Sequence, residues 1–353
     1  MDGFKNIEIK NFRGIDHLKI DDFSRVNVFL GQNNSGKSSV LEAIMMIVGM
    51  SNPYLPAALN AIRAKKTESE FADIRYFFHN LVLSVLPEIS AEQTNNIRRK
   101  LTLEMPLDME GKTTIEIGQI PRSDSMTLVD TLNMKFELAS NGNVKQFVST
   151  YTLGKPIKRA EDYQEKFGVS FVSADLTGSA LTGNLTHLFK QKMKPVILER
   201  MQIFDKHING VEIFSNEVFI SFEGIAEYLP IAMSGDGLRR YLNIVAASAN
   251  PVNNIIVIDE IDNGLHYSAY KKLWEAIFAL ATTTNKQVFV TTHSKETLCR
   301  LYEMLEENPA YQQELRLYTL EKTKLKGFQA YKYTYEGLSG ACENDIELRS
   351  IVM

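Results

Sequence analysis

The sequence predicts an α/β protein with a parallel core sheet, an antiparallel β subdomain and an inserted β-rich arm. Two short, continuously apolar runs, 255–258 and 288–290, are separated by a helical pattern. A strand–helix–strand unit of this kind forms parallel strands joined by a right-handed crossover. A third apolar run, 26–30, leads into a glycine-rich turn and an amphipathic helix. Residues 100–153 carry strand patterns of their own, which predict the arm.

The first elements follow from the spacing of apolar residues. Residues 4–10 and 15–20 alternate apolar and polar side chains, which predicts half-exposed strands of an antiparallel hairpin. The run 26–30 is mostly apolar, as expected of a central strand. From Lys37 onward apolar positions recur every three or four residues, which predicts an amphipathic helix that Pro53 ends.

The middle of the chain has weaker patterns. We expect irregular helix over residues 55–100, followed by strands over 100–105, 113–117 and 132–153. Within the last of these runs, Asn141 and Gly142 predict a two-residue hairpin turn, because both residue types tolerate positive φ.

The rest of the chain predicts a second block. A strand at 169–172 and a helical stretch at 188–204 precede the two apolar strands of the core sheet. We therefore expect three segments. Residues 1–165 form the first lobe with the inserted arm, 166–310 form the second lobe, and 311–353 form a C-terminal β extension.

Composition excludes several classes of protein. The chain has 353 residues, of which 44% are hydrophobic and 23% charged, as in ordinary globular proteins. The first residues lack the apolar core that is typical of a signal peptide, and no apolar run approaches the roughly 18 residues of a membrane span. Cys299 and Cys342 stand in no metal-binding spacing. We expect a cytoplasmic protein that does not contact membranes.

Charge neither requires nor forbids a nucleic-acid partner. Lys and Arg total 39 against 43 Asp and Glu, a net charge of −4. This argues against binding nucleic acid over the whole surface, while a local basic face remains an option.

Residues 31–38, Gly-Gln-Asn-Asn-Ser-Gly-Lys-Ser, fit the phosphate-loop pattern G-x-x-x-x-G-K-[ST] between a strand and a helix. Backbone N–H groups of such a loop surround phosphates at the helix N-terminus. Lys37 is expected to contact the β- and γ-phosphates and Ser38 to bind Mg²⁺. The expected ATP-binding residues are Gly31, Asn33, Asn34, Ser35, Gly36, Lys37, Ser38 and Ser39.

Two carboxylates and a histidine follow the apolar strands. Asp259 and Glu260 come directly after the run 255–258, at the carboxyl edge where parallel sheets bind ligands. We expect Asp259 to bind Mg²⁺ and Glu260 to act as the general base that activates water. His293 follows the next strand, in position to contact a γ-phosphate.

A second anion site is predicted at Ser234-Gly235-Asp236-Gly237, which opens a helix. Small residues and free N–H groups at a helix start favour anions, as does the helix dipole. One ATP held between the phosphate loop of one subunit and this loop of another explains why one chain has two such sites.

These four elements occur in the order found in ABC-type ATPases, which the chain resembles. It is most similar to the RecF/SMC-like and OLD-like ATPases, through the opening Asn11-Phe12-Arg13-Gly14, the loop 31–43 and the stretch 258–266. The resemblance implies an ABC-type P-loop ATPase head with ATP and Mg²⁺ as cofactors and Lys37, Glu260 and His293 as catalytic residues. It covers residues 1–50 and about 169–300.

The resemblance also implies a dimer. Arg13 would approach the phosphates, while Ser234, Gly235 and Gly237 would contact the γ-phosphate of the partner's ATP, with 262–266 at the dimer seam. Asp236 departs from the family's usual glycine, and its charge is expected to keep affinity low before dimerisation. The family's Q-loop glutamine is not placed, since neither Gln93 nor Gln119 has a convincing context.

The subfamily can be narrowed. The span from Lys37 to Ser234 is too short and aperiodic for the coiled-coil arms of SMC-type proteins. After His293 no spaced carboxylate set resembles the nuclease of OLD-like proteins. The chain resembles the ATPase subunits of bacterial anti-phage systems such as Septu, Gabija and PARIS. We therefore expect a homodimer or higher homo-oligomer that controls a separate effector, a nuclease, in antiviral defence.

Two alternatives remain open. A RecF-like clamp in DNA repair would grip duplex DNA, with the basic stretches 98–100, 190–194 and 322–326 touching phosphates. A non-hydrolysing scaffold or sensor would need neither Glu260 nor His293, and both are present.

Overall fold

The computed structural model describes residues 3–64, 73–106, 131–172, 178–250, 253–323 and 327–350. The predicted strand at 113–117 lies outside them. The chain divides into two compact units. The first contains Met1–Asn6, Ile20–Leu41 and Phe167–Met353, and the second contains Ile7–Lys19 and Glu42–Lys166. This division differs from the three expected segments, because the phosphate loop clusters with the second half of the chain.

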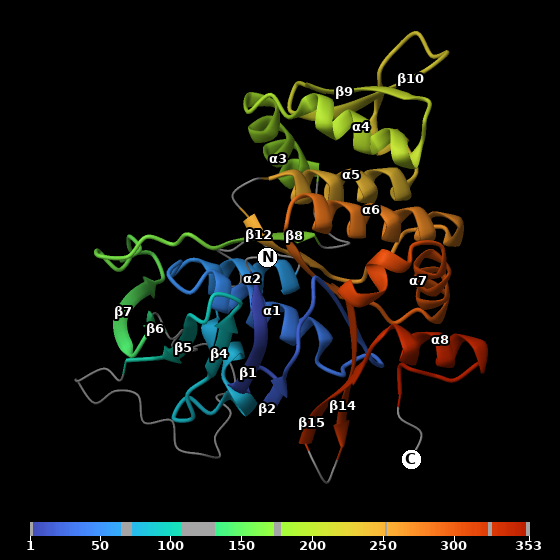
Figure 1. The fold of residues 1–353 in the computed structure, drawn as a ribbon. Coiled ribbons are helices and arrows are strands. Elements are labelled where there is room, and N and C mark those ends of the chain that lie inside the picture. Colours follow the sequence, from blue (N-terminus) through green and yellow to red (C-terminus); the bar gives the residue numbers. More distant parts are fainter. Residues whose placement is uncertain are drawn as a thin grey trace, which may run out of the picture. The chain divides into compact units, whose positions relative to one another are not determined.

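The first unit is built on a six-stranded sheet of order β15-β14-β3-β13-β12-β8 (Figure 1). Strands β8, β12, β13, β3 and β14 are parallel, and β15 runs antiparallel to β14. The predicted parallel core sheet is confirmed, and the C-terminal strands extend it. The strands are β3 (Val26–Leu30), β8 (Gly168–Val172), β12 (Asn253–Ile258), β13 (Gln287–Thr291), β14 (Leu315–Thr323) and β15 (Gly327–Tyr333).

Strand register brings the motifs to one edge of this sheet. Ile258 of β12 pairs with Val290 of β13, and Val290 pairs with Val28 of β3. All three strands are parallel, so the residues that follow them emerge together at the carboxyl edge. The phosphate loop, the Asp259–Glu260 pair and His293 are these residues.

Helices and a small antiparallel sheet complete the first unit. The sheet has the order β11-β10-β9, and its strands are antiparallel. Helices α5 and α6 pack against each other beside the core sheet, and the indole of Trp274 in α6 is fully buried there (Figure 1). No helix in the described ranges is both long and apolar enough to span a membrane.

The remaining elements of this unit, with 3-10 helices written η, are α3 (Gly178–Lys190), α4 (Lys194–Phe204), β9 (Ile208–Phe214), β10 (Glu217–Phe222), β11 (Leu229–Pro230), η3 (Ile231–Met233), α5 (Asp236–Ala249), η4 (Tyr267–Ala269), α6 (Tyr270–Thr283), α7 (Lys295–Glu307), η5 (Pro309–Glu314) and α8 (Tyr335–Glu343).

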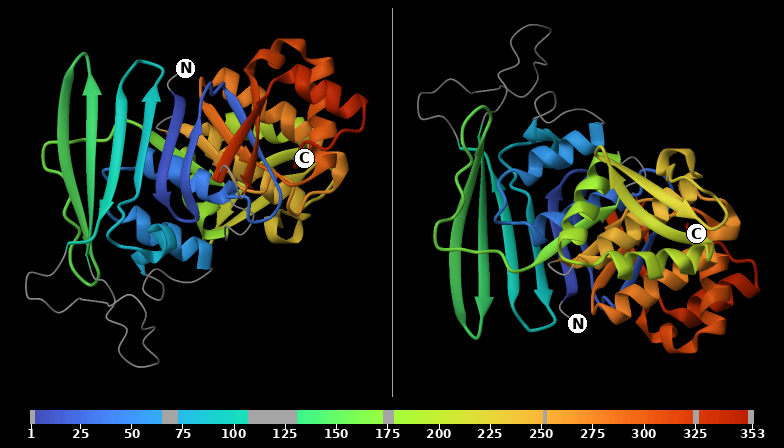
Figure 2. Two further views of the ribbon diagram at one scale, coloured as in Figure 1. Left: turned by 90° about the horizontal axis from the view of Figure 1, so that it is seen from below. Right: turned by 90° about the horizontal axis from the view of Figure 1, so that it is seen from above.

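The second unit contains the inserted arm as a six-stranded sheet of order β2-β1-β4-β5-β6-β7, whose strands lie side by side in Figure 2. Its elements are β1 (Phe4–Phe12), β2 (Ile15–Ile20), α2 (Leu55–Ala64), η1 (Ile74–Phe77), η2 (His79–Leu81), β4 (Glu88–Gln93), β5 (Arg98–Glu104), β6 (Thr131–Ser140) and β7 (Asn143–Thr152). The predicted turn is confirmed: Asn141 and Gly142 link β6 to β7 with φ of 50° and 80°.

Two expectations for this unit were wrong. Irregular helix was expected over 55–100, but the helix ends at Ala64 and residues from Glu88 onward form strands β4 and β5. The alternating burial of Ile89, Ala91 and Gln93 is the period-2 pattern of a half-buried strand. Short strands of this kind are easily mistaken for helix when their polar face is charged.

Helix α1 (Lys37–Val48) also ends before the expected Pro53. The Arg99 guanidinium of β5 is buried and donates hydrogen bonds to the carbonyls of Ile47 and Val48, at 3.1 and 3.0 Å. These are carbonyls that the last turn of a helix leaves without partners, and a cation there also suits the helix dipole. The helix end is therefore satisfied by an arginine that is distant in the sequence.

Candidate nucleotide-binding site

The phosphate loop joins β3 to α1 through three residues with positive φ, namely Gly31 (148°), Asn34 (65°) and Gly36 (91°). A Cβ atom on Gly31 would lie 2.3 Å from the Ser35 hydroxyl, and one on Gly36 would lie 2.9 Å from the Phe328 ring. Both glycines are therefore required by close packing as well as by backbone conformation. The Ser35 hydroxyl is buried without a hydrogen-bond partner among the described residues, as expected of a group kept for a ligand.

Lys37 is directed along the loop. Its ammonium group donates to the carbonyls of Gly31 and Gln32, both at 2.8 Å. Burial lowers the pKa of Lys37, while the nearby carboxylates of Asp259, Glu260 and Asp262 raise it. A buried ammonium held by backbone carbonyls can exchange them for phosphate oxygens, which carry more charge.

The expected Mg²⁺ ligands lie together. The Ser38 hydroxyl donates to Oδ1 of Asp259 at 3.5 Å. Hydroxyl and carboxylate oxygens are the donors that Mg²⁺ prefers, and this ion commonly completes its shell with water and phosphate oxygens. Within the described ranges no group of three or more His, Cys, Asp or Glu could hold a metal ion. Ser38 and Asp259 supply oxygen atoms of the kind that Mg²⁺ binds.

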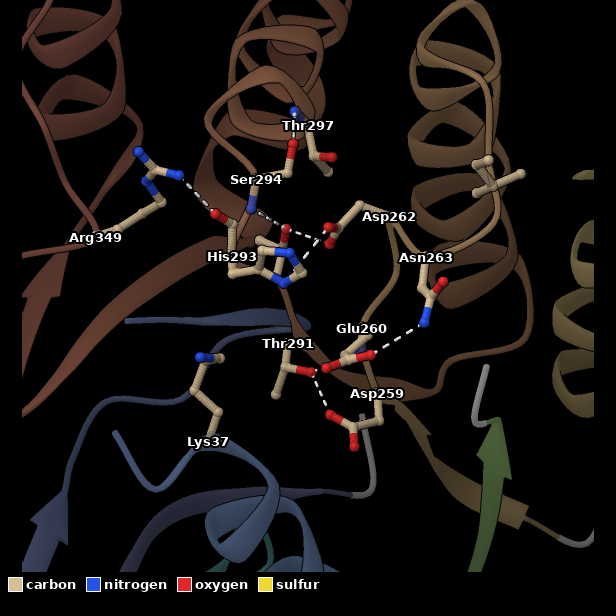
Figure 3. Close-up of polar contacts among 12 residues, drawn as sticks. Lys37, Asp259, Glu260, Asp262, Asn263, Thr291, His293, Ser294, Thr297 and Arg349 are labelled. Carbon is tan, nitrogen blue, oxygen red and sulfur yellow. Dashed lines mark hydrogen bonds and ion pairs between the residues drawn. The ribbon is translucent and has the colours of Figure 1, made fainter. Parts of the chain in front are cut away.

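Thr291, the last residue of β13, contacts both acidic residues, the backbone of Glu260 and the carboxylate of Asp259 (Figure 3). Its hydroxyl accepts the Glu260 N–H at 2.8 Å and donates to Oδ1 of Asp259 at 2.5 Å. Glu260 has a φ of 50°, an uncommon conformation for a residue with a side chain. Its Oε2 accepts a bond from the Asn263 amide at 3.2 Å. Thr291 thus orients the expected base and the expected metal ligand together.

Arg240 of α5 bonds the backbone of the same turn. Its buried guanidinium donates to the carbonyl of Asp259 at 2.8 Å and also to that of Glu260. These bonds pair two backbone carbonyls that continue no strand, and they hold Glu260 in its left-handed conformation. Asp259 and Glu260 themselves remain half-buried, so their carboxylates stay accessible.

His293 is oriented by the residue expected at the dimer seam. Its Nδ1 lies 3.6 Å from Oδ2 of Asp262, whose other oxygen accepts the Thr292 hydroxyl at 2.6 Å. The Asp262 side chain is 6% exposed and the His293 side chain 49% exposed. Asp262 therefore faces inward, whereas Asn263, Gly264 and His266 are exposed. Nδ1 is the ring nitrogen on the Asp262 side, and His293 also lines a cavity beside the phosphate loop.

The serine-glycine turn precedes α5 as expected. Gly235 is the N-cap residue, with no side-chain hydrogen bond closing the helix start, and Ser234 is half-buried. Asp236 is exposed and pairs with Arg239 at 2.7 Å, which offsets its charge. A Cβ on Gly264 would lie 3.6 Å from the Cβ of Asp236, so the two exposed loops are neighbours.

Within the described residues, the two anion-binding elements share no polar contact. Across the part of the chain that the structure describes, no hydrogen bond or ion pair joins residues 234–237 to residues 31–38.

Arg13 belongs to the second unit. Its buried guanidinium donates to Oε2 of Glu42 at 2.8 Å and lies 4.0 Å from the centre of the Phe77 ring. Its Nη2 has no hydrogen-bond partner in the described ranges. An approach of Arg13 to the phosphates stays a prediction. Gln93 is buried at the end of β4, and Gln119 lies outside the described residues, so the Q-loop remains unassigned.

Sequence reasoning missed several residues of this site. Thr291 could have been noticed as a hydroxyl residue ending an otherwise apolar strand. Arg240 follows the serine-glycine turn inside α5, where no local pattern indicates that it bonds the Asp259–Glu260 turn. Glu347 and Arg349, which lie beside the loop together with Ser350, belong to no recognisable motif, so no local pattern could have indicated them.

Comparisons with known proteins agree with this geometry. A family model described as an AAA domain, putative AbiEii toxin, type IV TA system, matches residues 26–299. An "ATP/GTP phosphatase" of Helicobacter pylori is 27% identical over 334 residues, which cover 86% of this chain and 88% of that protein. The DNA replication and repair protein RecF of Lactococcus lactis is 55% identical over 40 residues, 11% of each chain.

A solved structure shows the same fold. The SMC head bound to the C-winged helix domain of ScpA matches with a TM-score of 0.50 at 12% identity, and the match covers 94% of this chain and 98% of that one. The predicted fold class, an ABC-type head with a parallel core sheet, is confirmed.

Thr291→Val should reduce ATP turnover, because the methyl group can neither accept from Glu260 nor donate to Asp259. We expect kcat to fall about 10- to 100-fold, the usual effect of misplacing a catalytic group slightly. Thr291→Ser keeps the hydroxyl and should retain most activity. Phosphate release at saturating ATP measures both variants, and unchanged turnover in Thr291→Val would remove Thr291 from the site.

Proposed function

This chain belongs to the family of AAA domains described as putative AbiEii toxin, type IV TA system, and is an ATPase of the RecF and SMC type, and we propose that it acts through ATP-dependent closure of two copies. The observation that carries this proposal is the separation of its two anion-binding elements. In the described chain no hydrogen bond or ion pair joins residues 31–38 to residues 234–237. One triphosphate between two chains would use both.

Exposed residues support a composite site. Met233, beside the serine-glycine turn, is 81% exposed, a large value for an apolar side chain. Gly235, Asp236 and Gly264 are exposed next to it. In a closed dimer these residues would be covered, and the free N–H groups of α5 would meet the γ-phosphate bound to the other copy.

We assign the following roles within one chain. Lys37 and the loop amides bind the β- and γ-phosphates, and Ser38 and Asp259 hold Mg²⁺, which when bound offsets phosphate charge. Glu260 accepts the proton of the attacking water, and Thr291 orients its backbone. His293, fixed by Asp262, donates from Nε2 to the γ-phosphate. Hydrolysis would remove the contact that holds the two copies together.

We further propose that closure controls a separate effector, a nuclease, in bacterial defence against phage. The family description names a toxin of a toxin–antitoxin system, which supports a role in a multi-component system. The β-rich arm and the C-terminal segment are the elements we propose for docking. ATP binding and hydrolysis would switch the two copies between a closed and an open arrangement, and the effector would respond to that difference.

A clamp on duplex DNA is a second candidate, favoured by the match to RecF. The first basic stretch gives it little support, because Arg98 pairs with Glu92 at 3.7 Å and Lys100 with Glu88 at 3.2 Å. Arg99 is buried, and its guanidinium bonds the end of α1. In the other two stretches, Lys194 pairs with Glu212, and residues 324–326 lie outside the described chain. A non-hydrolysing scaffold would not need a catalytic base. Glu260 is nevertheless oriented by hydrogen bonds to Thr291 and Asn263.

Glu260→Gln should trap an ATP-bound dimer. The amide cannot accept a proton from water, while phosphate binding by the loop persists. Light scattering after gel filtration in saturating ATP and Mg²⁺ should give twice the monomer mass. In ADP the same variant should give the mass of a monomer. A Glu260→Gln protein that stays monomeric in ATP would contradict the proposed closure.

Mixing two inactive variants should restore turnover. Lys37→Ala removes the phosphate contact of one element, and Ser234→Ala removes that of the other. A heterodimer of the two keeps one intact composite site, so a mixture should recover part of the wild-type rate of phosphate release. Complete absence of rescue would contradict sites shared between copies.

Protection from phage should depend on the same residues. A host carrying this gene with the genes that adjoin it should form fewer phage plaques than a host carrying an empty vector. Lys37→Ala should return plaque counts to the vector level, because the dimer cannot form without bound ATP. Equal protection by wild type and Lys37→Ala would separate the ATPase from defence.

A further inference from the structure

A cavity of about 300 Å³ adjoins the phosphate loop and is lined in part by the C-terminal segment 347–350. Its other walls are the start of the loop, residues 31–33, and His293. The Lys37 ammonium donates to the carbonyls of Gly31 and Gln32, so the cavity lies beside the lysine. The lysine of a phosphate loop contacts the β- and γ-phosphates. A cavity beside Lys37 is therefore a suitable place for the terminal phosphate.

Arg349 supplies a second cation to this cavity. Its Nε and Nη2 donate to the two oxygens of Glu347, and its Nη1 donates to the carbonyl of His293 at 2.7 Å. Figure 3 shows Arg349 and Asp262 approaching His293 from opposite sides. The Arg349 guanidinium lowers the pKa of Glu347 to about 2, so the pair is charged at neutral pH. The two side chains remain 33% and 31% exposed.

The segment that carries Arg349 is anchored to the first unit. Leu348 is buried in its apolar core, and the Leu348 carbonyl accepts the hydroxyl of the fully buried Thr319. The Ile346 N–H donates to the Ala341 carbonyl at 2.8 Å. Glu347 and Arg349 flank the buried Leu348, so alternation directs both toward the cavity while Leu348 faces the core. Arg349 is thus placed by the fold.

An exposed arginine–carboxylate pair contributes little stability by itself. The same guanidinium fork matches phosphate as well as carboxylate, and a phosphate offers more negative charge. We propose that Arg349 is a ligand of the terminal phosphate of ATP bound by its own chain, and that Glu347 holds its guanidinium in place between nucleotides. This inference rests on the proposed function of residues 31–38. It adds a residue from the end of the chain to the site.

The test compares binding of a slowly hydrolysed ATP analogue and of ADP by titration calorimetry. A Ser234→Ala background is used, so that binding reports on the site within one chain. Arg349→Gln should lower the affinity for the analogue about tenfold, the typical loss for one charge-assisted contact. It should change the affinity for ADP by less than about twofold. Equal weakening of both nucleotides, or of neither, would overturn the proposal.

Glu347→Gln separates a phosphate contact from a purely structural role. If Arg349 binds phosphate, releasing it from Glu347 should leave the analogue's affinity unchanged or higher. If the pair only holds the segment in place, Glu347→Gln should weaken the analogue as Arg349→Gln does, which would contradict the proposal. Arg349→Lys keeps the charge without the fork and should fall between wild type and Arg349→Gln. A Lys variant no better than the Gln variant would also count against the contact.

Two further variants complete the design. Arg316→Gln breaks a comparable pair with Asp22, with 21% of its arginine side chain exposed, and Arg316 does not line the cavity. It should bind both nucleotides like the parent protein, and a tenfold loss for the analogue alone would overturn the assignment to Arg349. Lys37→Ala should lose both nucleotides. If it binds them normally, the proposed nucleotide site itself fails, whatever Arg349→Gln shows.

Discussion

The hydrogen-bonded register of β3, β13 and β12 is the constraint on which the site depends. Pairing of Val28 with Val290 and of Val290 with Ile258 brings three strand ends to one edge. Because the strands are parallel, their carboxyl ends lie at the same edge of the sheet. The residues directly after each strand are therefore close together without long connecting loops. A shift of one residue in this pairing would turn Thr291 away from Asp259 and Glu260.

At that edge, polar groups are paired before any ligand arrives. Carbonyls of the phosphate loop accept hydrogen bonds from Lys37. Thr291 accepts the N–H of Glu260, and Arg240 donates to the carbonyl of Asp259. Such pairing keeps the groups in position, so little reorganisation is needed during reaction. The left-handed Glu260 is sustained by these bonds, as expected where strain accompanies function.

Basic side chains in this protein serve mainly as internal partners. Arg99 ends α1, Arg13 is buried against Glu42 and Phe77, and Arg240 braces the carboxylate turn. Arg349 differs, because its carboxylate partner is exposed and lies at a cavity beside the phosphate loop.

The sequence alone determined what local patterns encode. The phosphate loop, the buried strands, the Asp259–Glu260 pair and the turn at 141 and 142 all follow from residue type and spacing over a few positions. Tertiary structure decided the rest. It made a strand of Glu88–Gln93, ended α1 with Arg99, and joined Thr291, Arg240 and Arg349 to the motifs. The reason is physical: these outcomes depend on which distant side chain can reach an unpaired backbone or charged group, and no short stretch of sequence records that.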